Sequence, residues 1–133
     1  MKYLLDTNIC IFFFHDKFNI SNILKSKKIE NCCVSEITIA ELRYGAENSA
    51  NPQKHHEIVD IFLKKIVLIP ITNSLLVYAK EKVRLKKAGT PVHDDFDLLI
   101  AATAIQNNLT LITDNVKDFK NIRDIRIENW IER

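Results

Sequence analysis

Short apolar runs and longer segments with helical spacing alternate along the whole of this chain. The apolar runs are four or five residues long and most are followed by a polar residue, which is typical of buried strands rather than helices. Strands are expected at 2–5, 32–35, 66–69 and 109–113, with a short edge strand at 126–128. Helices are expected at 9–14, 20–27, 35–45, 52–65, 73–88 and 97–104, with one more between the last two strands.

The order of these elements indicates the fold class. Helices separate the strands, and the connections are long enough for crossovers, so the sheet is expected to be parallel. We therefore predict an α/β fold with a doubly wound, mainly parallel sheet of four to five strands and helices on both faces. The chain has 133 residues, 47% of them apolar, with only two Gly and three Pro, which indicates a single domain over residues 1–133.

Three helical features leave alternatives open. The 9–14 helix is apolar on all sides, so it is either buried or offers a hydrophobic patch to a partner. Thr38 and Glu41 have the spacing of a capping box, in which Glu41 would turn toward the backbone of Thr38; the competing interpretation leaves Glu41 free for a site. Gly45 lies inside the same helix, which indicates close approach by another backbone.

Charge and cysteine content limit the classes of protein and the compartments to which the chain can belong. The net charge of +2 is too small to identify a nucleic-acid-binding protein by itself. Cys10, Cys32 and Cys33 are odd in number and lack C-x-x-C spacing, which favours neither disulfides nor a zinc site and indicates the cytoplasm. The longest apolar runs fall far short of the roughly 20 residues that a membrane span needs. A grouping of basic residues is typical either of a solvated face or of phosphate contact; its members are Lys25, Lys27, Lys28, Lys64, Lys65, Lys80, Lys82, Arg84, Lys86 and Lys87.

Acidic residues mark the candidate site. Asp6 directly follows the first strand and Asp114 follows the fourth, at the sheet edge where open α/β folds bind ligands. Asp6 could alternatively do no more than cap the next helix. Asp95, at the entrance of the 97–104 helix, is also explained by capping. Asp97 is not, because it lies above small apolar residues that must face inward.

Four separate segments thus carry acids that a doubly wound sheet can bring to one edge: Asp6, Glu41, Asp97 and Asp114. Two bare carboxylates about 4 Å apart repel by roughly 4 kcal/mol at an effective dielectric constant of about 20. Three or more must therefore share protons or bind a cation. Because no His or Cys accompanies them, oxygen ligation favours Mg²⁺, for which Mn²⁺ can substitute.

These residues resemble those of the PIN-domain family, and specifically of the VapC toxins of bacterial toxin–antitoxin modules. The resemblance covers nearly the whole chain, and its motifs are weak singly but specific in this order and spacing. The motifs are Leu5-Asp6-Thr7-Asn8, Ser35-x-x-Thr38-x-x-Glu41-Leu42-x-x-Gly45, Gly89-Thr90-Pro91-Val92, Asp97-Leu98-Leu99-Ile100-Ala101-Ala102-Thr103-Ala104, and Leu111-Ile112-Thr113-Asp114-Asn115 with Phe119.

The resemblance implies that Asp6, Glu41 and Asp97 are catalytic acids that hold Mg²⁺. PIN domains often have a fourth acid where this chain has Asn115, with Asp114 one residue earlier, and Asn115 could ligate through its carbonyl or a water. Asp95 is near enough in the chain to assist. The implied activity is a metal-dependent endoribonuclease that hydrolyses phosphodiester bonds in structured RNA, in several relatives initiator tRNA, with a metal-activated water. The use of one metal ion or two stays open.

The resemblance also implies partners, namely an RNA substrate, a cognate VapB-like antitoxin and a second copy of the chain in a homodimer. We expect the antitoxin to lie across the 9–14 helix and the stripe of Ile58, Ile61 and Phe62, and to place a Lys or Arg among the acids. One alternative is a catalytically degenerate PIN-like module that binds RNA or protein without cutting. Another is a haloacid dehalogenase-like phosphatase, which needs a second Asp where this chain has Asn8.

Overall fold

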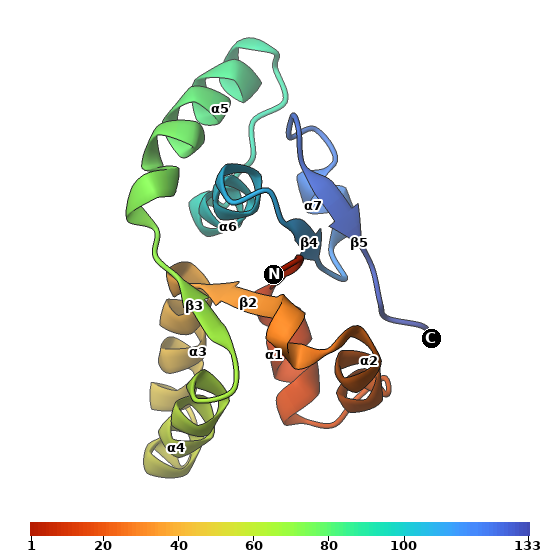
Figure 1. The fold of residues 1–133 in the computed structure, drawn as a ribbon. Coiled ribbons are helices and arrows are strands. Elements are labelled where there is room, and N and C mark those ends of the chain that lie inside the picture. Colours follow the sequence, from red (N-terminus) through yellow and green to blue (C-terminus); the bar gives the residue numbers. More distant parts are fainter.

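A five-stranded sheet forms the middle layer of the molecule (Figure 1). The computed structural model describes residues 1–133. Its strands are β1 (Tyr3–Leu5), β2 (Cys32–Ser35), β3 (Val67–Ile69), β4 (Thr110–Ile112) and β5 (Arg126–Glu128). They are arranged in the order β3-β2-β1-β4-β5, and every neighbouring pair is parallel. The predicted doubly wound parallel sheet is confirmed, and its direction of winding switches between β1 and β4.

Helices cover both faces of this sheet. They are α1 (Thr7–Phe14), α2 (Ile20–Lys27), α3 (Glu36–Glu47), α4 (Pro52–Leu63), α5 (Leu75–Lys87), α6 (Asp95–Gln106) and α7 (Val116–Phe119). Figure 1 shows α1 to α4 on one side of the sheet and α5 to α7 on the other. None of them is long and apolar enough to cross a membrane. The predicted order of strands and helices is confirmed.

Two apolar cores lie between these layers. Successive strand residues point to opposite faces, so Leu5 of β1 packs in the core on the side of α1 to α4, whereas Leu4 packs in the core on the side of α5 to α7. Trp130 closes the first core from the C-terminal tail, with its ring edge-on to Tyr3 at a centroid distance of 4.9 Å. The C-terminal tail is therefore packed against the body of the molecule through Trp130.

The start of α3 differs from the prediction. Ser35 caps this helix, because its Oγ accepts a hydrogen bond from the backbone N–H of Thr38 at 3.1 Å. Thr38 therefore lies inside the first turn, which excludes the capping box and leaves the alternative in which Glu41 is free for a site. The close backbone approach at Gly45 was wrong, since a Cβ built there would meet nothing within 4 Å. The Glu41 carboxylate is thus not used to cap α3, and no other part of the chain covers Gly45.

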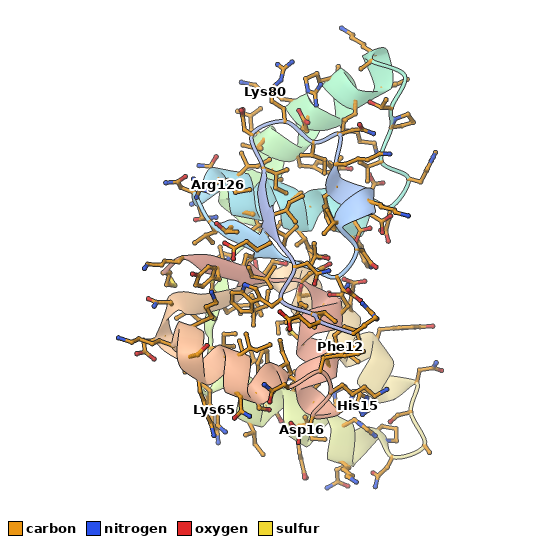
Figure 2. The ribbon with its side chains drawn as sticks, turned by 90° about the vertical axis from the view of Figure 1, so that its right-hand side faces the viewer. Phe12, His15, Asp16, Lys65, Lys80 and Arg126 are labelled. Atoms are coloured by element: carbon orange, nitrogen blue, oxygen red, sulfur yellow. The ribbon has the colours of Figure 1, made fainter.

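The basic residues do not form one patch. Figure 2 shows Lys65, just after α4, and Lys80, on α5, at opposite ends of the molecule. Lys25 and Lys28, from the end of α2, line one hollow with Lys65. The basic residues that were grouped in the sequence analysis are therefore divided between two distant surfaces.

Candidate active site

Asp6 stands at the carboxyl end of β1, beside the switch in winding direction, and is only 4% exposed. One of its carboxylate oxygens accepts from the backbone N–H of Thr7 at 2.8 Å, which caps α1, and the other accepts from the Thr113 hydroxyl at 2.7 Å. Burial raises the pKa of Asp6, the bonds from Thr113 and Thr7 lower it in part, and the charges of Asp118 and Asp94 raise it further. Asp6 therefore caps α1 and also lies near other carboxylates, so capping alone does not explain its environment.

Glu41 reaches the same edge from the second turn of α3. The Thr7 hydroxyl donates to Glu41 Oε1 at 2.7 Å, and the Thr38 hydroxyl oxygen lies 3.2 Å from that of Thr7. Burial raises the pKa of Glu41, the bond from Thr7 lowers it in part, and the charges of Asp6 and Asp94 add to the rise. A chain of hydroxyl groups thus links the first residue of α1 to the carboxylate of α3.

Asp97 is the third residue of α6, and its carboxylate has no hydrogen-bond or salt-bridge partner among the protein's side chains or backbone groups. Its pKa is raised from 3.8 to about 7, first by burial and then by the charges of Asp94, Asp6, Asp118 and Glu41. A helix N-terminus normally favours a negative charge, so these effects outweigh the helix dipole. The structure therefore brings Asp6, Glu41 and Asp97 close enough to influence one another, and we call these three residues the acidic cluster.

The remaining acids singled out in the sequence have other partners. Asp95 points to α5, where its Oδ1 accepts from Lys82 Nζ at 2.7 Å and from the Tyr78 hydroxyl at 3.0 Å. The Asp114 carboxylate is held by Arg133, with Nη1 to Oδ1 at 2.8 Å, and the neighbouring Asn129 amide also donates to it. Both carboxylates carry a cation of their own, and for both this lowers the pKa. The structure does not bring them into the acidic cluster.

Asn115 begins the short helix α7, and its side chain makes no capping bond there. Its backbone N–H donates to the Thr113 hydroxyl at 3.0 Å, the same hydroxyl that donates to Asp6. Asn115 thus helps to fix the Asp6 side chain through Thr113. Its proposed role as a ligand stays a prediction.

Asp118, which the sequence analysis missed, supplies a carboxylate where Asp114 does not. Its charge raises the pKa of both Asp6 and Asp97. Asp118, Asp97 and Asp94 line one pocket of about 370 Å³, and Lys117 is its only lysine or arginine. The sequence pattern singled out Asp114 because it follows a strand, whereas Asp118 lies on the short helix α7 that comes after it. The sequence signal nearest to Asp118 is the motif residue Phe119, which follows it directly. In the structure Phe119 is completely buried.

The donor set fits a hard divalent cation. It consists of carboxylate oxygens, and Asp97 has neither a cation nor a hydrogen bond to offset its charge, which is the situation that Mg²⁺ relieves. No three acidic, imidazole or thiol side chains are arranged so that they could hold a metal ion by themselves. Mg²⁺ does not require one, because it usually keeps several waters and binds through one or two carboxylates together with substrate phosphates.

Comparison with known proteins places this geometry in a family. A model described as PIN domain matches residues 3–125. The chain is 35% identical over 133 residues to Ribonuclease VapC2 of Rickettsia felis and 32% identical over 131 residues to the tRNA(fMet)-specific endonuclease VapC of Salmonella typhimurium, each time covering 98% of both chains. The solved structure of DNA-bound VapBC from Salmonella typhimurium matches with a TM-score of 0.90 and 33% identity, over 98% of each chain. The resemblance seen in the sequence motifs is confirmed, and the chain belongs to the PIN-domain family.

Proposed function

We propose that this protein is the endoribonuclease toxin of a VapBC-type toxin–antitoxin module and that it hydrolyses phosphodiester bonds in structured RNA with the help of Mg²⁺. The observation that carries the metal requirement is the unpaired carboxylate of Asp97, which lies beside Asp6 and Glu41 and has a pKa raised to about 7. The relatives that are 35% and 32% identical bear the names of ribonucleases. A tRNA substrate is a finer part of the proposal, supported by the name of the Salmonella relative.

The residues that would hold the ion are Asp6, Glu41 and Asp97, with Asp118 as the fourth carboxylate. Mg²⁺ bound there would supply Lewis acidity, which would lower the pKa of a water molecule and offset negative charge on the phosphoryl oxygens. The Thr7 and Thr113 hydroxyls orient Glu41 and Asp6 through their 2.7 Å hydrogen bonds.

The pocket beside the acidic cluster would take the RNA strand. It is lined by the loop that contains Thr90 and His93, by Asp97, and by Lys117 of α7. Lys117 is the group that would contact a phosphate. Binding of RNA should therefore weaken as the salt concentration rises.

A cleavage assay tests the proposal. The purified protein should cut structured RNA in Mg²⁺ or Mn²⁺ and not in a chelating buffer, and Asp97→Asn should lose this activity. Cleavage that persists in the chelating buffer would exclude the metal mechanism. RNA binding without cleavage in either metal would instead indicate the degenerate, non-catalytic module.

The antitoxin would lie in a groove of about 480 Å³ between α1, α3 and α4. The groove is lined by Ile11 and Phe14 of α1, by Glu41 of α3 and by Ile58 of α4. The α1 helix is therefore buried on one side and offers an apolar surface on the other, since Ile9 is buried while Ile11 is 41% exposed. Both alternatives for this helix thus apply in part. The groove would guide an antitoxin Lys or Arg to the acidic cluster, where its charge replaces that of the metal. A complex in which the acidic edge stays open while cleavage is lost would contradict this.

A homodimer is part of the same proposal. Leu76 and Val83 lie two turns apart on α5 and are 65% and 51% exposed, so they present an apolar strip that a second copy would cover. Sedimentation of the protein without antitoxin at micromolar concentration should show a dimer, and a monomer would contradict it. The proposed compartment is the cytoplasm, where the three buried free cysteines would stay reduced.

A further inference from the structure

Glu81 lies in the middle of α5, and it and Asp6 are the two buried carboxylate residues of the protein. It belongs to no part of the acidic cluster. Its oxygens accept from Arg84 Nε at 2.8 Å, from Arg84 Nη2 at 2.6 Å and from the backbone N–H of Arg123 at 2.7 Å. Burial alone would raise the pKa of Glu81, but these bonds and the charges of Arg84 and Arg123 lower it overall. A fully bonded buried anion of this kind fixes the groups that donate to it.

The groups held by Glu81 and Arg84 lie immediately after α7. Arg84 Nη2 also donates to the carbonyl oxygen of Asn121 at 2.9 Å. Arg84 and Glu81 of α5 thus bond the backbone at Asn121 and at Arg123, and we call this arrangement the α5 clamp. The α7 helix has only four residues and no side-chain cap, so it does little to hold its own position.

The α5 clamp acts on one wall of the pocket beside the acidic cluster. Asp118 lies three residues before Asn121, and both residues line that pocket with Asp97. Phe119 anchors α7 in the core from one side, and the α5 clamp holds the following segment from the other. The direction in which Asp118 points is therefore set by two attachments, and one of them is polar and directional.

Stability alone does not account for the α5 clamp. The Glu81–Arg84 ion pair is partly exposed, since the Arg84 side chain is 29% exposed, and such a pair contributes little net stability. A bidentate Arg–carboxylate pair instead gives directional specificity. The clamp thus fixes the direction of the backbone after α7, whereas Phe119 supplies the apolar burial.

We propose that Glu81 and Arg84 are positioning residues, which hold α7 so that Asp118 faces Asp97 and Asp6. The effect on catalysis rests on the proposed nuclease function, whereas the effect on α7 does not. Replacing Glu81 by Ala removes the acceptor of the Arg123 amide, and it also removes the carboxylate that orients Arg84 toward the Asn121 carbonyl oxygen. Asp118 then no longer faces the acidic cluster in a single orientation.

The first test is a double-mutant cycle on RNA cleavage. Glu81→Ala should lower kcat by about 10–100-fold, the usual effect of removing a group that orients a metal-site residue. Glu81→Gln, which keeps an oxygen acceptor for the Arg123 amide, should recover part of this loss. In an Asp118→Asn background, Glu81→Ala should cause little further loss, because the residue that it positions has already been disabled.

Leu24→Ala provides the matched control for lost stability. Leu24 is buried on α2 in the other core, far in the fold from α7. Cleavage is measured below the unfolding range of every variant. The proposal fails if Glu81→Ala lowers kcat no more than Leu24→Ala does, or if its effect is as large with Asp118→Asn as without it.

Crystal structures of the wild-type protein and of Glu81→Ala give a second measurement that requires no activity. The expected result is a displaced or disordered α7 with an unchanged sheet, and an α7 that stays in place would overturn the proposal. If the wild-type protein does not cleave RNA in Mg²⁺, the proposed function fails. The position of α7 in the two crystal structures then still decides between a positioning role and none.

Discussion

Replacement of Asp97 by Asn separates a structural role of this residue from a catalytic one. Asn keeps the size and the capping ability of the side chain but removes its charge. The pKa of Asp97 rises from 3.8 to about 7, which at about 1.36 kcal/mol for each pKa unit disfavours the charged form by about 4 kcal/mol. Because Asp97 is only half-buried, solvent screening reduces this value, and we expect about 2 kcal/mol. Asp97→Asn should therefore stabilise the metal-free protein.

The sign of this effect depends on pH in a defined way. The pKa of Asp97 is higher in the folded protein than in the unfolded chain, so the folded state binds the proton more tightly. The extra stability that the bound proton gives to the folded protein is complete below about pH 4 and is lost as the pH rises through about 7. The unfolding free energy of Asp97→Asn should thus exceed that of the wild type by nearly nothing at pH 4 and by about 2 kcal/mol at pH 8. For a chain of this size, that is a rise of about 6 °C in Tm.

Thermal unfolding in a chelating buffer and RNA cleavage at limiting Mg²⁺ measure the two consequences on one variant. Cleavage by Asp97→Asn should fall by orders of magnitude, although the variant is the more stable protein without metal. Asp95→Asn is the control, since it changes the same residue type two positions away but affects a carboxylate paired with Lys82. Equal Tm values at pH 8 together with wild-type cleavage would refute the reasoning and leave Asp97 as a helix-entry residue.

Three further substitutions test separate parts of the structure. Thr113→Val removes the hydroxyl that donates to buried Asp6 at 2.7 Å, and it should lower both cleavage and the unfolding free energy, the latter by about 1–3 kcal/mol; an unchanged Tm would show that the bond is not formed. Gly45→Ala should raise the unfolding free energy by about 1 kcal/mol, because the added methyl group meets nothing within 4 Å and Ala is the better helix former, and a fall in Tm would contradict this. Asp114→Ala should leave RNA cleavage unchanged, since its carboxylate is held by Arg133, and a large loss would return Asp114 to the site.

The fold could be predicted from the sequence because it depends on which residues are buried. Strands such as β2 are buried on both faces and appear as continuous apolar runs, which composition alone reveals. The boundaries were less accurate, since they depend on pairing and capping. The β4 strand spans 110–112 rather than 109–113, and α3 is capped by Ser35, whereas the sequence spacing also allowed a cap at Thr38.

The candidate site was predictable where a residue lies at the end of an element that the hydrophobic pattern reveals. Asp6 directly follows β1 and Asp97 lies in the first turn of α6, and the structure brings them together. Asp118 has no such position, because it lies on a single helical turn whose placement depends on contacts with α5 rather than on local pattern. The pairing of Asp114 with Arg133 was equally hidden, since it joins the end of β4 to the end of the chain.

The two threonines of the site show how the acidic carboxylates differ in their freedom to move. The Thr113 hydroxyl holds Asp6 and the Thr7 hydroxyl holds Glu41, each through a bond of 2.7 Å, whereas Asp97 has no such donor. Groups that are oriented before a ligand arrives need little reorganisation when it binds. A cation entering this edge would therefore find two carboxylates already oriented, and its binding would mainly reorder Asp97, the carboxylate whose charge is disfavoured most without it.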